Sequence, residues 1–200
     1  ALISDIIDIS RIETGLINIV HSKLNIEYDL TKIVHSLQFE KTETISEIKL
    51  NFDISCNNQS TFTDKERFKQ IVINLIKNAI KFTQNGEVAL SARVIRKNEL
   101  YNFNYNGAAI TEKEKILLIA VDDQGIGIAP ENQQLIFEPF RKVDNKEILY
   151  PGIGLGLSIV KNLTKLLEGE VWLKSEIGTG STFYFYIPIK TEAENSNPEK

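Results

Sequence analysis

Segments with helical and with alternating apolar periodicity follow one another in this chain without a strict strand–helix–strand repeat. Helical patterns cover residues 1–20, the stretch from Asp29 to about 44, the stretch after Asp64 and the stretch after Gly156. Strand patterns cover 23–30, 48–55, 86–95, 116–123, 169–176 and 181–189. We therefore predict an α+β fold, a two-layer α/β sandwich with helices on one face of a mixed sheet, preceded by a helical stub.

Composition excludes several classes of protein. The 200 residues are 42% hydrophobic, enough for a core, and carry a net charge of −4 without a basic block, so direct nucleic-acid binding is not expected. The single cysteine, Cys56, excludes an internal disulfide and favours a reducing compartment. We expect no membrane contact from this chain, because it has no membrane-length apolar run. Because it starts without Met, we expect it to be a piece of a longer protein.

The first twenty residues carry apolar side chains at intervals of four and three, which is typical of a coiled-coil seam. These residues are Leu2, Ile6, Ile9, Leu16 and Val20, with Glu13 interrupting the series. Two interpretations stay open on periodicity alone. The segment is either the first helix of a domain or the stub of a helical hairpin that dimerises.

The stretch GIGLGLSIVK, residues 152–161, places three alternating glycines before an apolar helix. Backbone N–H groups at such a turn can hold a phosphate, and the helix dipole adds favourable charge. The spacing differs from the dinucleotide-binding fingerprint, and the Gly-Lys-Ser/Thr ending of a P-loop is missing. Alone, the stretch fits a phosphate cradle or a plain turn.

A second glycine pair follows a strand in DDQGIGIAPE, residues 122–131. A carboxylate at the strand end could accept a hydrogen bond from the exocyclic amine of a base, while the glycines let the base lie flat on the chain. The alternative is a turn with a solvated aspartate.

The helix INLIKNAIKF, residues 73–82, carries two asparagines four residues apart, Asn74 and Asn78, and two lysines with the same spacing, Lys77 and Lys81. Each pair shares one helix face. An amide oxygen suits Mg²⁺, and a lysine one turn on could neutralise phosphate. The alternative is a pair of buried amides.

Together these motifs, NxxxNAxKF, DxGxG, FxPF, GxGLGL and GTGSTF in that order, resemble the ATP-binding domain of sensor histidine kinases, in the GHKL superfamily. The resemblance covers 23–190 and implies a Bergerat-type ATP-binding fold there. Residues 1–22 resemble the end of the second helix of the family's dimerisation and histidine-phosphotransfer hairpin. We expect 191–200 to be a disordered tail.

The resemblance implies a role for each matching residue. Asn78 is the Mg²⁺ ligand, Asn74 supports the triphosphate site, Lys81 contacts phosphate, Phe82 lies beside the adenine and Asp123 recognises its amine. The base approaches over Gly125, Gly127 and Ile128. Phe137 and Phe140 form the F box, and Arg141 or Lys142 reaches the γ-phosphate from a lid that runs to Pro151. The hinge and phosphate-contacting backbone are Gly152, Gly154, Leu155, Gly156 and Leu157, and the third glycine box, near the base, holds Gly178, Gly180 and Thr182.

The implied activity is transfer of the γ-phosphoryl group of ATP, with Mg²⁺, to a histidine of the phosphotransfer helix, followed by relay to an aspartate of a response-regulator receiver domain. Neither His21 nor His35 lies in the family's acceptor motif, so we expect the acceptor upstream of Ala1. No residue of this chain is then certain to be catalytic, and the chain should bind ATP without phosphorylating itself. The whole protein is expected to be a homodimer whose helix is phosphorylated in the same or the partner subunit. This chain would be the cytoplasmic portion of a membrane-anchored sensor.

Two alternatives remain in view. A GHKL hydrolase needs a glutamate base where this chain has Asn74, which cannot take up a proton from water. A non-catalytic scaffold is signalled by loss of Asp123 or Asn78, and both are present.

The long segment 97–115, with Tyr101, Phe103 and Tyr105, is either a partner contact or, as we expect, a disordered tip.

Overall fold

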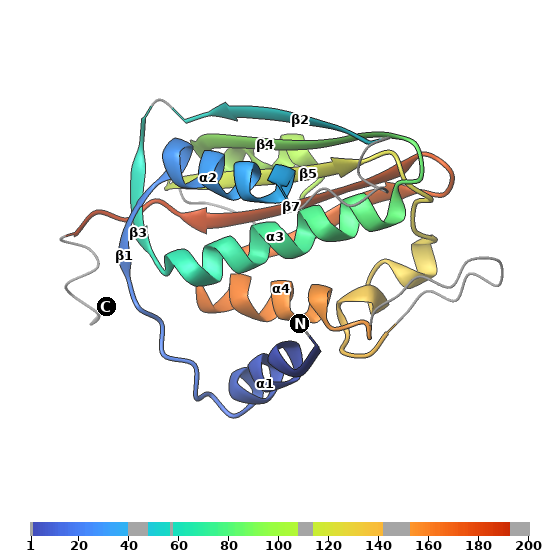
Figure 1. Cartoon of the computed structure of the whole chain (residues 1–200). Coiled ribbons are helices and arrows are strands. Elements are labelled where there is room, and N and C mark those ends of the chain that lie inside the picture. The colour runs from blue at the N-terminus through green and yellow to red at the C-terminus, as the bar shows by residue number, and fades with distance from the viewer. Residues whose placement is uncertain (1, 40–47, 57, 108–113, 142–152, 193–200) are drawn as a thin grey trace.

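A mixed five-stranded sheet forms one layer of the protein (Figure 1). The computed structural model describes residues 2–39, 48–56, 58–107, 114–141 and 153–192. The sheet order is β2-β4-β5-β7-β6, with β6 at one edge; β2 is parallel to β4 and the other neighbours are antiparallel. Its strands are β2 (Ile48–Ser55), β4 (Gly86–Arg96), β5 (Lys115–Asp123), β6 (Glu170–Glu176) and β7 (Gly180–Pro188). This confirms the predicted α+β class.

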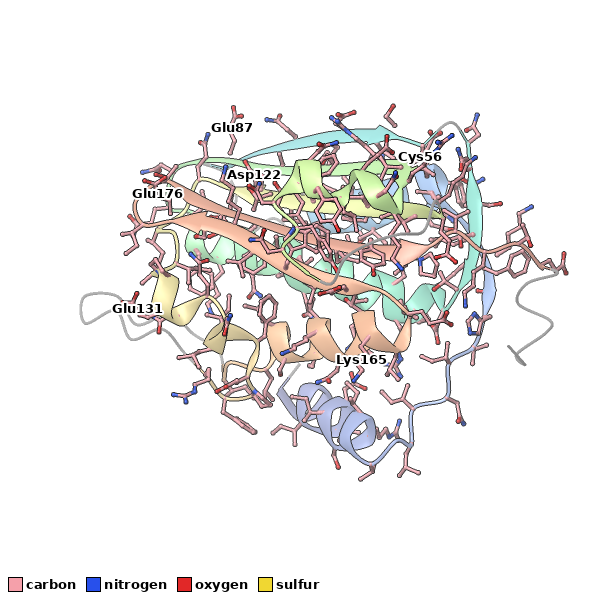
Figure 2. All side chains as sticks on the ribbon, turned by 180° about the vertical axis from the view of Figure 1, so that it is seen from behind. Cys56, Glu87, Asp122, Glu131, Lys165 and Glu176 are labelled. Atoms are coloured by element: carbon pink, nitrogen blue, oxygen red, sulfur yellow. The ribbon has the colours of Figure 1, made fainter. Side chains whose placement is uncertain are left out.

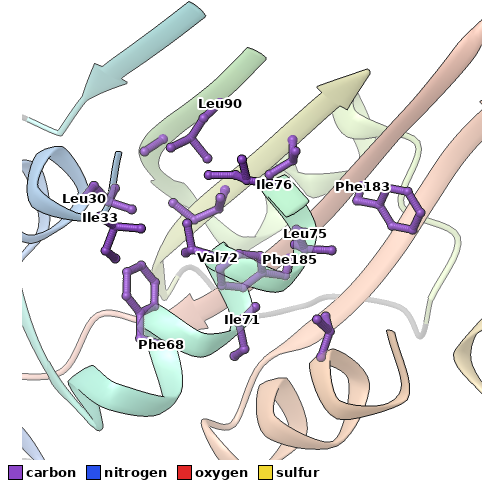
Figure 3. Packing of buried hydrophobic residues seen from close by; sticks show 14 of the residues in the cluster. Leu30, Ile33, Phe68, Ile71, Val72, Leu75, Ile76, Leu90, Phe183 and Phe185 are labelled. Atoms are coloured by element: carbon purple, nitrogen blue, oxygen red, sulfur yellow. The ribbon is translucent and has the colours of Figure 1, made fainter. Parts of the chain in front are cut away.

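Helices cover one face of this sheet. They are α2 (Ile26–Phe39), α3 (Lys65–Phe82) and α4 (Gly156–Leu166). The helical period of α3 buries six side chains: Phe68, Ile71, Val72, Leu75, Ile76 and Ala79. Figure 3 shows how this face meets Leu90, Phe183 and Phe185 of the sheet. Each large apolar side chain buried here contributes about 1.5–3 kcal/mol, so this face anchors the helix layer.

The start of α3 follows the sequence prediction. The Asp64 carboxylate accepts hydrogen bonds from the N–H groups of Glu66, at 3.0 Å, and Arg67, at 3.1 Å. Such a cap satisfies donors that the helix itself leaves without partners. The register of α3, and with it the positions of its asparagines, is therefore fixed at its first turn.

The prediction of a strand over 23–30 is wrong after its third residue. Strand β1 (Ser22–Asn25) pairs with β3 (Ser60–Thr63), a strand that the sequence pattern did not reveal, and α2 begins at Ile26. The Asn25 side chain accepts from the Tyr28 N–H at 3.3 Å, and Asp29 accepts from the Asn25 N–H at 2.8 Å. The predicted cap, Asp29, therefore supports the true cap, Asn25. The predicted end of this helix near 44 lies outside the described residues.

The opposite, outer face of the sheet is also covered (Figure 2). The 3₁₀ helix η2 (Lys97–Phe103) packs there with Tyr105, which is 5% exposed and donates to Glu170 at 2.6 Å. Trp172 donates to the Phe103 carbonyl at 2.9 Å. The prediction of a disordered tip is therefore wrong for 97–107, and 108–113 lie outside the described residues. The local sequence pattern does not reveal this packing, because the residues that contact 97–107 belong to β6 and β7, which are distant in sequence.

Helix α1 (Leu2–Glu13) is shorter than the 1–20 pattern predicts. It ends in a turn where Gly15 has φ +68° and the Leu16 N–H bonds to the Arg11 carbonyl at 2.9 Å, the arrangement that commonly terminates helices. Helix α1 packs beside α4 (Figure 1). Ile9 of α1 is buried in the core. Within the described ranges, no helix is long and apolar enough to cross a membrane.

Candidate nucleotide-binding site

Asp123 lies at the end of β5 on the helix-covered side of the sheet and is only 6% exposed. Burial raises the pKa of its carboxyl from 3.8 to about 6, while hydrogen bonds from the backbone N–H groups of Gly125 and Ser181 partly oppose the shift. The Gly125 bond measures 2.9 Å. A carboxylate has about four acceptor positions, so Asp123 keeps capacity to accept from a ligand amine.

The two glycines of the following loop are required by the packing of the chain itself. A Cβ on Gly125 would come within 2.6 Å of the Phe82 carbonyl oxygen, which shows that the loop passes directly over the end of α3. Gly127 has φ +69°, and a Cβ there would overlap the Glu176 carbonyl oxygen. The structure thus brings Phe82, Asp123 and the loop together, as the motifs predict.

The asparagine face of α3 meets the start of α4. A Cβ on Gly156 would lie 3.7 Å from the Asn78 Nδ2 and 3.9 Å from the Asn74 Oδ1. Leu155, the cap residue of α4, gives no side-chain hydrogen bond to the first turn. The first turn of α4 therefore begins beside the asparagine side chains and has no capping side chain, so its N–H groups are available to an anion.

A cation and an aromatic ring lie at the end of α3. The Lys81 ammonium lies 4.7 Å from the centre of the Phe82 ring, close enough for a cation–π contact. The contact places positive charge at the last turn of α3, whose final carbonyl, that of Phe82, lies against the glycine loop. The roles of Lys81 as a phosphate contact and of Phe82 as an adenine contact stay predictions.

The region around the predicted lid is only partly described. The Arg141 guanidinium is paired with Glu138 at 3.0 Å, and Phe140, 65% exposed, donates its N–H to the Gly154 carbonyl at 3.1 Å. Phe137 contacts Phe183 edge to face, with ring centres 6.4 Å apart. Of the other predicted residues near the hinge, Leu155 belongs to the packed core, and Leu157 is partly buried against it. Lys142, Gly152 and the rest of the lid lie outside the described residues.

Thr182 is not brought to the site. Its hydroxyl donates to Asp122, and both residues face the outer side of the sheet. The residue of β7 opposite Asp123 is Ser181, which is 6% exposed. Strict alternation along a strand explains the correction, because neighbouring residues point to opposite faces. The same alternation could have identified Ser181 from the sequence.

Two further polar residues support the loop and were missed by the sequence motifs. The Ser175 hydroxyl accepts from the Ile128 N–H at 2.8 Å, and the Gln133 side chain donates to the Ile128 carbonyl at 3.0 Å. Ser175 lies two positions before a turn, a weak signal, whereas nothing local marks Gln133. Among the described residues, no group of three histidine, cysteine or acidic side chains is placed to hold a metal ion.

Known proteins share these features. Residues 63–191 match the family described as histidine kinase-, DNA gyrase B-, and HSP90-like ATPase. The autoinducer 2 sensor kinase/phosphatase LuxQ of Vibrio vulnificus is 39% identical over 100% of this chain and 23% of its own length. The circadian input-output histidine kinase CikA of Synechococcus elongatus is 35% identical over 98% of this chain and 24% of its own length. The chain thus spans about a quarter of these relatives.

Solved structures of histidine kinases have a similar fold. Full-length ShkA in complex with AMPPNP has a TM-score of 0.73 and 27% identity, over 95% of this chain and 35% of that one. The catalytic domain of histidine kinase ThkA has a TM-score of 0.62 and 23% identity, over 86% of this chain and 97% of that one, and supports the fold. The chain belongs to the histidine kinase-, DNA gyrase B-, and HSP90-like ATPase family, as the ATPase domain found in sensor histidine kinases.

Proposed function

We propose that this chain binds ATP with Mg²⁺ and presents the γ-phosphoryl group to a histidine of a phosphotransfer helix in the same protein. The observation that carries the proposal is the meeting of Asn74 and Asn78 with the start of α4, on the side of the sheet where Asp123 ends β5. These residues supply an amide oxygen for a metal, N–H groups for phosphate and a carboxylate for an adenine amine. Such positioning and charge neutralisation are what phosphoryl transfer chiefly requires.

Asn78 fits a magnesium ion that takes most of its ligands from phosphate and water, because Mg²⁺ in nucleotide sites keeps few protein ligands. Bound there, the metal would neutralise charge on the phosphates. Asn74 would support the triphosphate, Lys81 would add positive charge, and Arg141 or Lys142 would reach from the lid. Gly152, Gly154 and Gly156 would bring backbone N–H groups to the phosphates.

The remaining assignments follow from the same proposal. The acceptor imidazole attacks the γ-phosphorus, the bond to the β-phosphate oxygen breaks and ADP leaves. Residues 1–22 are the end of the phosphotransfer hairpin, 23–190 the catalytic domain and 191–200 a tail. The partners are the phosphotransfer helix within a homodimer and a receiver domain, in the cytoplasmic portion of a membrane-anchored sensor.

Calorimetric titration with a non-hydrolysable ATP analogue, with and without Mg²⁺, tests the proposal. Binding should be enhanced by Mg²⁺, lost in Asp123→Ala and no longer enhanced by the metal in Asn78→Ala. Asp122→Ala, on the outer face, is the matched control and should bind normally. Absence of binding by the folded wild type would contradict the proposal, and steady ATP turnover by this chain would favour a hydrolase instead.

A further inference from the structure

The loop from Asp123 to Ile128 is held by another part of the chain, the hairpin that joins β6 to β7. The Gly178 N–H donates to the Ile126 carbonyl at 2.8 Å, and the Ile128 N–H donates to the Ser175 hydroxyl at 2.8 Å. Residues about fifty positions apart in sequence thus fix the loop beside the predicted adenine position.

Ser175 is the junction of this contact. Its hydroxyl lies 2.9 Å from the Gly180 carbonyl, to which it donates, and 2.9 Å from the Ser181 hydroxyl. A hydroxyl has one donor and two acceptor positions, so bonds from Ile128 and Ser181 together with the bond to Gly180 use all three. Since the Ser181 N–H also bonds to Asp123, Ser175 connects the loop and the carboxylate through one network.

Gln133 lies between η3 (Pro130–Asn132) and η4 (Leu135–Phe137) and also bonds to Ile128. We call the Ser175 and Gln133 side chains, which together hold Ile128, the clamp. The Gln133 Nε2 donates to the Ile128 carbonyl at 3.0 Å and to the Ser175 carbonyl at 3.1 Å. Two donors on one neutral nitrogen are available only from an amide side chain among the uncharged residues. Both main-chain polar groups of Ile128 are therefore fixed by side chains, Ser175 and Gln133.

We propose that Ser175 and Gln133 are positioning residues that set the distance between the glycine loop and Asp123 and thereby determine selectivity for adenine over guanine. The inference rests on the proposed function, because it assigns these residues to the same nucleotide site. A planar base can bind between the glycine loop and the end of β5 only if the distance between them is fixed. The Asp123 carboxylate can accept a hydrogen bond from the adenine amine and reject the guanine carbonyl only if it is held in one position. Without the clamp, the loop gains alternative positions and both affinity and discrimination fall.

Calorimetry with adenine and guanine triphosphate analogues, on the 200-residue chain, tests this. Ser175→Ala removes three hydrogen bonds and Gln133→Leu removes two. Each should weaken binding of the adenine analogue at least about tenfold and reduce the preference for it over the guanine analogue. Gln133→Glu has nearly the same shape without the two donors and should behave like Gln133→Leu. Ser175→Thr keeps the hydroxyl and should retain wild-type affinity and preference.

Thr179→Ala, in the same hairpin turn, and Gln134→Leu, the exposed neighbour of Gln133, are the matched controls and should leave binding within about twofold. Urea unfolding identifies variants that lose binding by unfolding, and Gln133→Glu decides the matter if Ser175→Ala is unstable. Wild-type affinity and selectivity in folded Ser175→Ala and Gln133 variants would overturn the inference. Failure of the wild type to bind either analogue would contradict the proposed function instead.

Discussion

Gly127 faces the main-chain carbonyl oxygen of Glu176 so closely that no side chain fits between them. This contact joins the loop after β5 to the end of β6, and the positive φ of Gly127 adds a second reason for glycine at this position.

Gly127→Ala should therefore destabilise the protein by more than about 3 kcal/mol, since backbone must move and an alanine must adopt a left-handed conformation. Gly178→Ala is the matched control, because Gly178 also has positive φ, at +77°, but open space where a Cβ would lie. It should cost about 1 kcal/mol. Urea unfolding measures both, and equal losses would refute the role of the Glu176 contact.

Gly156→Ala should separate binding from stability. The added methyl would lie 3.7 Å from the Asn78 amide, an ordinary contact, so the fold should tolerate it and gain up to about 1 kcal/mol from helix propensity. Nucleotide affinity should nevertheless fall, because the methyl occupies space between the asparagines and the start of α4. Thermal unfolding and calorimetry on the same sample test this. Unchanged affinity would place the phosphates elsewhere.

The pH dependence of stability should carry the signature of Asp123. With its pKa raised from 3.8 to about 6, the folded protein holds a proton more tightly than the unfolded chain. The free energy of unfolding should therefore fall by up to about 3 kcal/mol as the pH rises from about 4 to about 6, and stay lower above that. Asp123→Asn should remove this slope. Urea unfolding across that range, with Asp122→Asn as control, provides the measurement; identical slopes in wild type and Asp123→Asn would show the assignment to be wrong.

Asp8→Ala should loosen α1 from the domain. The Asp8 carboxylate accepts from the Gln70 side chain at 2.8 Å and pairs with Arg67 at 3.5 Å. Loss of these partly exposed contacts should cost about 1 kcal/mol locally and speed amide exchange in α1 while leaving α3 protected. Ser10→Ala, exposed on the same helix, is the control. Unchanged exchange in α1 would mean that Ile9 and its neighbours alone hold the helix.

Tyr105→Ala should open the outer-face cluster. Its ring meets Trp172 edge to face with centres 5.2 Å apart, and Trp172 is the chain's single tryptophan. Removal of the ring should cost about 3–5 kcal/mol and shift tryptophan fluorescence to longer wavelength as water reaches the indole. Tyr101→Ala is the control, because Tyr101 is half exposed. An unshifted spectrum would contradict the described packing.

Much of the site could be predicted because helix capping, the helical period and strand alternation, which depend on neighbouring residues alone, determine where its residues lie. The Asp64 cap and helical period fix where Asn74 and Asn78 lie on α3, and alternation fixes which residues of β5 face the helices. The clamp of Gln133 on Ile128 could not be predicted, since it depends on a tertiary approach of β6. Segment 97–107 was misjudged for the same reason, because its aromatic residues are stabilised by Trp172 and Tyr186 rather than by their neighbours in sequence.

The edge position of β6 has a consequence for behaviour at high concentration. An edge strand offers unpaired main-chain groups to any other strand, and sheets that leave such an edge uncharged tend to join one another. Here Glu170, Lys174 and Glu176 are exposed along β6. Pairing of two such edges would desolvate these charges, so the strand that helps to form the nucleotide site also opposes self-association through the sheet.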